Sequence, residues 1–96
     1  MGIALKNAGD LKGAIENYRR AIEIDPNYFE AFYNLGKALK KDGDFIGAID
    51  IYSKAIELDP SSTDANVNLG KILYKTGDIQ GAIDNYCRAI EIDPSF

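Results

Sequence analysis

One phrase recurs along this 96-residue chain at intervals of 34 residues. Segments 9–26, 43–60 and 77–94 each begin with Gly-Asp, end with Asp-Pro, and share 11 of their 18 positions. Segments 29–42 and 63–76 also match each other, with Asn-Leu-Gly near their centres. A period of this length indicates stacked copies of one small unit, in which each copy buries its apolar face against the next.

Each unit is expected to hold two helices joined by a tight turn. Apolar residues recur at every third or fourth position, which is typical of amphipathic helices and not of strands. Gly9, Gly43 and Gly77 suit the left-handed position that ends a helix, and the aspartate after each suits the cap of the next helix. The Asp-Pro pairs end each second helix, because proline cannot extend it, and Asn27 and Ser61 then resemble caps of the following helix. The sequence therefore predicts an all-α fold.

Some repeated positions have an expected place in the core. Tyr18, Tyr52 and Tyr86 occupy the same position of the three units. We expect them to be buried between stacked helices rather than to form a row of rings that bind a ligand. Gly36 is expected where a neighbouring helix approaches closely, because it has no side chain.

Composition disfavours several functional classes. The net charge is −4 and the sequence pI is about 4.7, so no basic field attracts nucleic acid or an anionic membrane. The sequence shows no secretory leader and no long apolar run, so we expect a soluble, cytoplasmic chain. The single cysteine, Cys87, has no histidine to activate it. We therefore expect no cofactor, no metal and no enzymatic activity.

The helix pairs resemble tetratricopeptide repeats, and the resemblance covers essentially the whole chain. The residues that carry it are Phe32, Leu35, Gly36, Leu39, Ala48, Tyr52, Ala55 and Pro60, and again Leu69, Gly70, Leu73, Ala82, Tyr86, Ala89 and Pro94. It implies a right-handed superhelical array of antiparallel helix pairs, with about three repeats at 1–28, 29–62 and 63–96. The first repeat would lack its opening turn. We expect the chain to be part of a longer array, and an intact short protein with unusual ends is the alternative.

Two features depart from the family pattern. Asn66 stands where an aromatic residue is usual, which is expected to loosen the contact between the second and third repeats. Gly13, Gly47 and Gly81 stand where the family usually has glutamate, at a cost of about 0.5–1 kcal/mol for each helix glycine. Their recurrence indicates either duplication of one unit or close backbone packing, and the sequence leaves both readings open.

The resemblance implies a peptide-binding groove whose inner wall is built from the first helix of each repeat. The residues expected on this wall are Tyr33, Asn34, Lys37, Lys40, Lys41, Val67, Asn68, Lys71, Tyr74 and Lys75, with Ile3, Lys6 and Asn7 from the first repeat. Six of the 11 Lys and Arg residues lie on these segments, so we expect a locally positive groove that binds an acidic or C-terminal peptide segment. A solvated lysine face that only keeps the helices soluble is the alternative.

Asn34 and Asn68 lie one repeat apart on the expected wall. A side-chain amide can donate to a peptide carbonyl and accept from a peptide N–H, and so can hold backbone without reading sequence. This arrangement resembles the asparagine ladder of O-linked N-acetylglucosamine transferases, although asparagine is common at this position in many such repeats. The carboxylate clamp of chaperone-binding relatives is not matched, because Ile3, Asp64 and Asn68 replace its Asn, Lys and Arg.

Self-association is a second hypothesis for the function. Apolar residues of the last helix and chain end, Ile83, Tyr86, Ile90 and Phe96, are expected to be exposed. Such an end could stack on another molecule and build dimers or head-to-tail filaments. The two hypotheses are compatible, since a stacked array would extend the groove.

Overall fold

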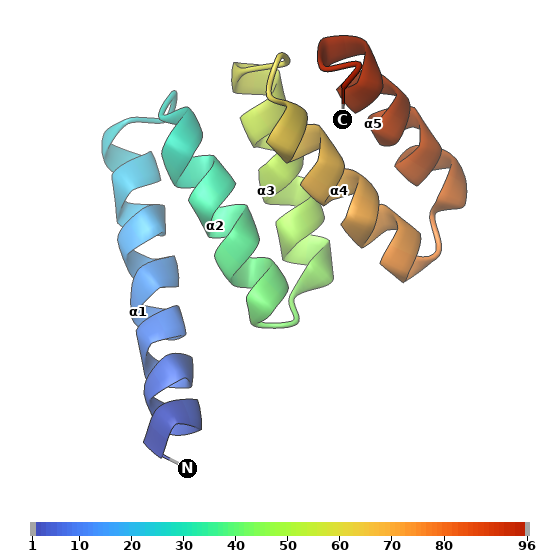
Figure 1. The fold of residues 1–96 in the computed structure, drawn as a ribbon. Coiled ribbons are helices and arrows are strands. Elements are labelled where there is room, and N and C mark those ends of the chain that lie inside the picture. Colours follow the sequence, from blue (N-terminus) through green and yellow to red (C-terminus); the bar gives the residue numbers. More distant parts are fainter. Residues whose placement is uncertain (1, 96) are drawn as a thin grey trace.

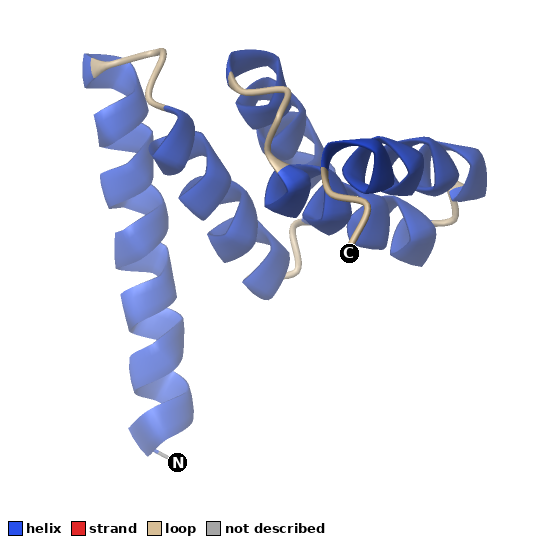
Figure 2. Cartoon of the chain, turned by 45° about the horizontal axis from the view of Figure 1, so that its top comes forward, coloured by secondary structure: helices blue, strands red, loops and turns tan. Residues whose placement is uncertain are grey.

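The structure is a computed structural model that describes the backbone of residues 2–95 and the side chains of residues 10–95. This part of the chain forms five helices and no strand: α1 (Gly2–Ile24), α2 (Phe29–Lys41), α3 (Phe45–Leu58), α4 (Thr63–Thr76) and α5 (Ile79–Ile92). Consecutive helices run antiparallel and pack against one another (Figures 1 and 2). The prediction of an all-α array of helix pairs is confirmed.

The second and third Gly-Asp pairs form the predicted turns. Gly43 and Gly77 have φ angles of 84° and 98°, which residues with a Cβ adopt only at a cost. Asp44 and Asp78 cap the helices that follow, and the Oδ1 of each accepts a backbone N–H three residues later, at 2.9 and 3.0 Å. These turns fold α3 back on α2 and α5 back on α4.

The caps explain two of the three unusual helix glycines. A Cβ on Gly47 would lie 2.5 Å from Asp44 Oδ2, and a Cβ on Gly81 would lie 2.5 Å from Asp78 Oδ2. Glycine at these positions therefore leaves room for the capping carboxylate. Gly13 is different, because a Cβ there would meet no atom within 4 Å.

The first Gly-Asp pair does not form a turn, so the predicted helix end at Gly9 is wrong. α1 runs through Gly9 and Asp10 as one helix of 23 residues. In Figure 1 its first half extends beyond the ends of the other helices. A turn at Gly9 would interrupt this helix. A continuous helix instead keeps the backbone hydrogen bonds through the pair.

The loops after the first two Asp-Pro pairs are held by the aspartate side chain. Asp25 Oδ1 accepts the N–H of Asn27 at 3.1 Å, and Asp59 Oδ1 accepts the N–H of Ser61 at 3.1 Å. Asn27 and Ser61 are therefore loop residues and not the caps that the sequence predicts. Ser62 caps α4 instead, and its Oγ accepts an N–H of the first turn at 3.2 Å.

The core lies between the helix pairs and includes Tyr52 and Leu35, whose exposed fractions are 0% and 1%. The ring of Tyr52 packs against Gly36, where a Cβ would lie 2.9 Å from the ring. Both predictions for these residues are confirmed. Tyr18 and Tyr86, at the equivalent positions, are only half-buried, because each belongs to an end of the array.

Asn66 is itself well buried, and the looser contact expected between the second and third repeats stays a prediction. Asn66 is 0% exposed, like the aromatic Phe32 at the equivalent position, which is 6% exposed. The Oδ1 of Asn66 accepts the Nδ2–H of Asn85 at 3.2 Å, and its own Nδ2 donates to the carbonyl of Ser62 at 2.9 Å. These bonds offset the cost of burying the amide.

Candidate functional site

Helices α2 and α4, which carry the predicted groove residues, are joined by a hydrogen bond between Tyr33 and Asn68. The Nδ2 of Asn68 donates to Tyr33 Oη at 3.2 Å and to the carbonyl of Asp64 at 2.8 Å. Both side chains are half-buried, so part of each still meets solvent. The bond spans 35 positions of the chain and ties the second helix pair to the third.

This bond decides which groups remain available to a ligand. Both hydrogens of Asn68 Nδ2 are used within the chain, so its Oδ1 is left as an acceptor. Tyr33 Oη accepts one hydrogen bond, and its own hydrogen has no acceptor among the described residues. Tyr33 therefore offers a ligand the donor, and Asn68 offers the acceptor. The expected asparagine ladder would instead have used Asn68 for both roles.

The ring of Tyr33 is fixed by its neighbours. Phe29 stacks on it with centroids 5.9 Å apart and planes at 13°, and Tyr52 meets it edge-on at 5.9 Å. Lys37 Nζ lies 5.5 Å from the ring centroid, within the range of a cation–π contact. Burial raises the pKa of Tyr33, the charge of Asp64 raises it further, and the hydrogen bond from Asn68 opposes the rise. Tyr33 therefore remains a neutral donor at physiological pH.

Asn34 lies on the same helix but in a separate hollow. A cavity of about 230 Å³ between α1 and α2 is lined by Asn34, Lys37, Lys41 and the ring of Tyr18, among others. The side chain of Asn34 makes no hydrogen bond to another described residue, so its donor and acceptor are both available. Asn34 and Asn68 are therefore not equivalent, because only Asn68 is bonded to a neighbouring helix.

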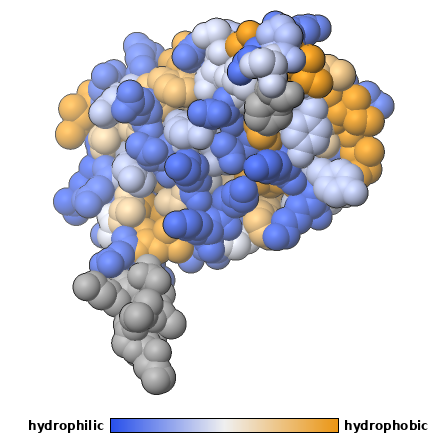
Figure 3. Space-filling model, viewed as in Figure 1, coloured by the Kyte–Doolittle hydropathy of each residue, from blue (hydrophilic) through white to orange (hydrophobic). Residues whose placement is uncertain are grey.

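The predicted lysines mostly face solvent. Lys37, Lys41, Lys71 and Lys75 are exposed, and Lys40 is half-buried. Polar residues gather across the middle of the face seen in Figure 1, where α4 passes in front of α3 (Figure 3).

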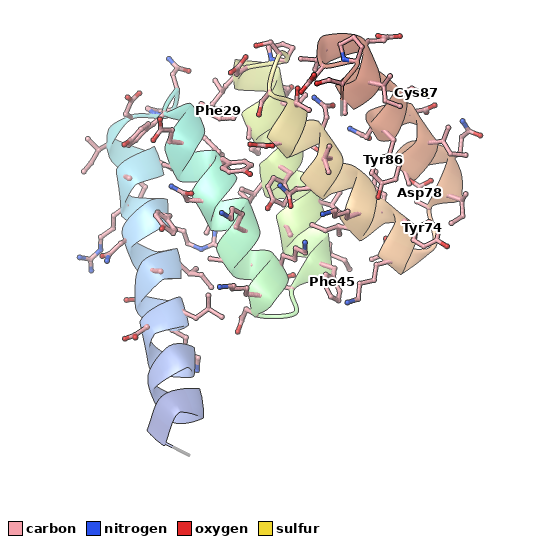
Figure 4. All side chains as sticks on the ribbon, in the orientation of Figure 1. Phe29, Phe45, Tyr74, Asp78, Tyr86 and Cys87 are labelled. Atoms are coloured by element: carbon pink, nitrogen blue, oxygen red, sulfur yellow. The ribbon has the colours of Figure 1, made fainter. Side chains whose placement is uncertain are left out.

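One of these lysines contacts an aromatic ring. Lys75 Nζ lies 5.1 Å from the ring centroid of Phe45, near the turn between α2 and α3 (Figure 4).

Tyr74 and Val67, the aromatic and the apolar groove residue predicted on α4, differ in exposure. Tyr74 is 63% exposed, whereas Val67 is only 6% exposed and offers almost no surface to a ligand. The side chains of Ile3, Lys6 and Asn7 lie outside the described residues.

The last helix carries an exposed apolar stripe. Ile83 and Ile90 are 47% and 52% exposed, and Tyr86 is half-buried. Ile79, which is 47% exposed, continues the stripe by one turn, and the sequence reasoning missed it. Its spacing of four residues before Ile83 was the available signal. Apolar surface is visible along the side of the molecule where α5 lies (Figure 3). Phe96 lies outside the described residues.

The described residues contain no group of histidine, cysteine and acidic side chains that could hold a metal ion. Cys87 is exposed on α5 (Figure 4). Among the described helices, none combines the length and apolar character needed to cross a bilayer.

Comparisons with known proteins agree on the repeat. A family model described as the TPR repeat matches residues 2–43 and 36–77, and a tetratricopeptide repeat model matches residues 63–96. A crystal structure of MamA is 32% identical, with a TM-score of 0.88, and the match covers 100% of this chain and 56% of that one. The search of curated proteins gives no match.

A crystal structure of YrrB, described as a TPR protein with an unusual peptide-binding site, is 28% identical, with a TM-score of 0.82. This match covers 97% of the present chain and 48% of YrrB, so the chain spans about half the length of these solved structures. The family models together match almost every residue, and the helix pairs, glycine turns and buried tyrosine agree with them. The chain therefore belongs to the tetratricopeptide repeat family.

Proposed function

We propose that this chain is a protein–protein interaction scaffold that binds an extended peptide segment of a partner along α2 and α4. The observation that carries the proposal is the bonded pair of Tyr33 and Asn68, which leaves a hydroxyl donor and an amide acceptor beside each other. The peptide-binding site ascribed to YrrB supports this type of function for the fold.

The pair matches the polar groups of an extended peptide. One residue of an extended strand can present its N–H and C=O to the same neighbour, as in the hydrogen-bonded pairs of an antiparallel ladder. Asn68 Oδ1 accepts the peptide N–H, and the Tyr33 hydroxyl donates to the carbonyl. Both contacts use backbone atoms, so they hold a peptide without selecting its side chains. Asn34 provides a further contact, from the hollow between α1 and α2.

Charge supplies the preference among peptides. Lys37, Lys40, Lys41, Lys71 and Lys75 lie on the two helices that carry the pair. A segment with acidic side chains gains from these lysines, and the gain shrinks as salt screens it. We therefore propose an acidic peptide segment as the ligand.

A defined probe tests the proposal. The peptide acetyl-(Glu-Gly)₄-amide is titrated into the 96-residue chain by calorimetry at low and high salt. Affinity should fall with salt, and both Tyr33→Phe and the double variant Asn34→Ala with Asn68→Ala should weaken it by about tenfold. Tyr28→Phe is the matched control, because Tyr28 is 46% exposed, precedes α2 and is not one of the expected groove residues. Equal affinity for Tyr33→Phe and the unaltered chain would refute the role of the pair.

Self-association through α5 is a second candidate function. The exposed residues Ile83 and Ile90 occupy the positions of Ile49 and Ile56 in the preceding repeat, which pack against the hydrophobic core. We propose that the α5 stripe packs on a second molecule in the same way. Ile83→Glu with Ile90→Glu should then abolish any rise of the light-scattering mass with concentration. Ile46→Glu is the control, because Ile46 is 82% exposed on another helix. If the light-scattering mass rises equally with concentration in the unaltered chain, in the double variant and in Ile46→Glu, the contact between molecules lies outside the α5 stripe.

A further inference from the structure

Two hollows of similar size recur at the repeat spacing. The first, of about 360 Å³, lies among α1, α2 and α3, and the second, of about 320 Å³, lies among α3, α4 and α5. Equivalent residues line both, including a glutamate and a cation: Glu23 and Lys54 in the first, Glu57 and Arg88 in the second. These volumes are at the lower end of the range for small-ligand sites.

The second hollow lies on the side of α4 away from the peptide groove. Leu69 and Leu73 of α4 line it. At about 100° of rotation per residue, these two leucines point away from Lys71 and Lys75 on the same helix. A ligand in this hollow is therefore separate from a peptide held by Tyr33 and Asn68.

A buried amide distinguishes the second hollow from the first. Asn85 lines it and is only 6% exposed, and the equivalent residue in the first hollow is Ile51. One hydrogen of Asn85 Nδ2 is donated to Asn66 Oδ1 at 3.2 Å. The other hydrogen and the Oδ1 of Asn85 have no partner among the described residues. The Oδ1 of Asn85 is therefore open to a ligand in the hollow, because Tyr52 Oη is the only side-chain polar atom of the described residues that is both sealed from solvent and without a partner.

We infer that this second hollow is a binding site for the C-terminal aliphatic residue of a partner chain. The aliphatic side chain rests on the apolar floor formed by Ile56, Leu69 and Leu73. Its free carboxylate pairs with Arg88 and accepts from Asn85, and its peptide N–H donates to Asn85 Oδ1.

The two donors that line the hollow, Asn85 and Arg88, both belong to α5, so the carboxylate of the ligand is placed on the α5 side. Arg88 follows Asn85 by three positions on α5, so both side chains lie on the same face of that helix. Guanidinium groups bind carboxylates through two parallel hydrogen bonds. Glu57 lines the hollow from α3, and its negative charge disfavours an acidic side chain and any carboxylate that does not pair directly with Arg88. A neutral aliphatic residue with one carboxylate is therefore the best match.

Nuclear magnetic resonance with small probes tests the inference. N-acetyl-leucine is titrated into the ¹⁵N-labelled chain, and the side-chain amide of Asn85 and the backbone of 85–88 are followed. We expect saturable shifts there, and about tenfold weaker binding of N-acetyl-leucinamide, which lacks the carboxylate. Shifts of equal size with the amide, a stronger response to cationic leucinamide, or no shift with any probe would each overturn the inference.

Variants copied from the first hollow provide the second test. Asn66→Phe with Asn85→Ile installs the residues found at Phe32 and Ile51, so it replaces the amide pair with an apolar pair already tolerated by the fold. Arg88→Met removes the charge from an exposed position and does not depend on that repacking.

Both changes should weaken N-acetyl-leucine binding by about tenfold, whereas Lys54→Met in the first hollow and Tyr33→Phe in the groove should leave it unchanged. Full binding by Arg88→Met would contradict the inference. Loss of N-acetyl-leucine binding in Tyr33→Phe would also contradict the inference, because it would show that the ligand binds in the groove and not in a separate hollow. If the groove peptide fails to bind while N-acetyl-leucine binds, only the proposed groove is refuted.

Discussion

The ring of Tyr52 lies against Gly36 so closely that a Cβ on Gly36 would be 2.9 Å from ring atoms Cδ1 and Cε1. The same contact recurs one repeat later, where a Cβ on Gly70 would be 2.9 Å from Cε1 of Tyr86. In both places a first helix meets the second helix of its own pair. Glycine therefore sets how closely the two helices pack, and the tyrosine fills the space that a side chain would take.

Adding one methyl group at Gly36 should destabilise the fold. Gly36→Ala forces the Cβ into the buried ring of Tyr52, and overpacking of this kind costs about 1–3 kcal/mol. Gly13→Ala is the matched control, because a Cβ there meets no atom within 4 Å, and it should stabilise α1 by about 0.5–1 kcal/mol. Urea denaturation measures both. A Gly36→Ala variant as stable as Gly13→Ala would show that the close contact is absent in solution.

The continuity of α1 can be tested in the same way at Gly9. Because Gly9 lies inside a helix, Gly9→Ala should raise the helix content or the stability by about 0.5–1 kcal/mol. Gly43→Ala should instead destabilise by about 1–2 kcal/mol, because φ is 84° at that turn. Circular dichroism and thermal unfolding follow both variants. Equal losses in the two variants would mean that Gly9 forms a turn like that at Gly43.

Tyr52 carries a buried hydroxyl for which the described residues provide no hydrogen-bond partner. Tyr52→Phe removes this unsatisfied group and keeps the ring, so it should stabilise the fold by about 1 kcal/mol. Denaturant unfolding near neutral pH measures the change. A loss of stability would show that the hydroxyl is bonded, for example to an ordered water.

The same residue makes stability depend on alkaline pH. Burial raises the pKa of Tyr52 above its usual value, and the nearby Tyr33 adds to the rise. The unfolded chain therefore loses this proton first, at about pH 10, so the stability contributed by Tyr52 is full below that pH and is lost as the pH rises further. Tyr52→Phe should flatten the fall in unfolding free energy between about pH 9 and about pH 11. An unchanged slope would contradict the burial of a neutral hydroxyl.

The bond between Asn68 and Tyr33 should be visible in the titration of Tyr33. The hydrogen bond from Asn68 lowers the pKa of Tyr33, against the larger effect of burial. Asn68→Ala should therefore raise the pKa of Tyr33 further, and an NMR titration of the ring signals measures it. Lys71→Ala is the control on the same helix, because Lys71 is exposed. If the pKa of Tyr33 stays the same or falls in Asn68→Ala, the side chains of Asn68 and Tyr33 do not form the hydrogen bond.

Sequence reasoning succeeded where structure is local and repeated. The helix pairs, the turns at Gly43 and Gly77, and the burial of Tyr52 follow from periodicity and backbone preferences. The turn predicted at Gly9 is absent, because α1 is continuous there. A turn between two helices also needs packing of the helices on both sides of it, and the repeated sequence pattern carries no information about packing.

The polar pairs were beyond the reach of the sequence pattern. Tyr33 and Asn68 are 35 positions apart, and Asn66 and Asn85 are 19 apart. Whether such side chains meet depends on their rotamers and on helix packing, not on the period of the sequence. The predicted groove residues could be named from the family resemblance. Their division into exposed lysines, a bonded pair and a buried Val67 required the structure.

The most direct test of peptide binding along α2 and α4 is to follow the side-chain amide of Asn68 during a titration with acetyl-(Glu-Gly)₄-amide. Binding should shift the Asn68 amide signals together with backbone signals of α2 and α4. The backbone response should be lost in Tyr33→Phe with Asn68→Ala, and the Asn68 amide response should be lost in Tyr33→Phe alone, while the far-ultraviolet circular dichroism stays the same. Shifts confined to α5, or saturable binding that survives in the double variant, would contradict a groove built on Tyr33 and Asn68.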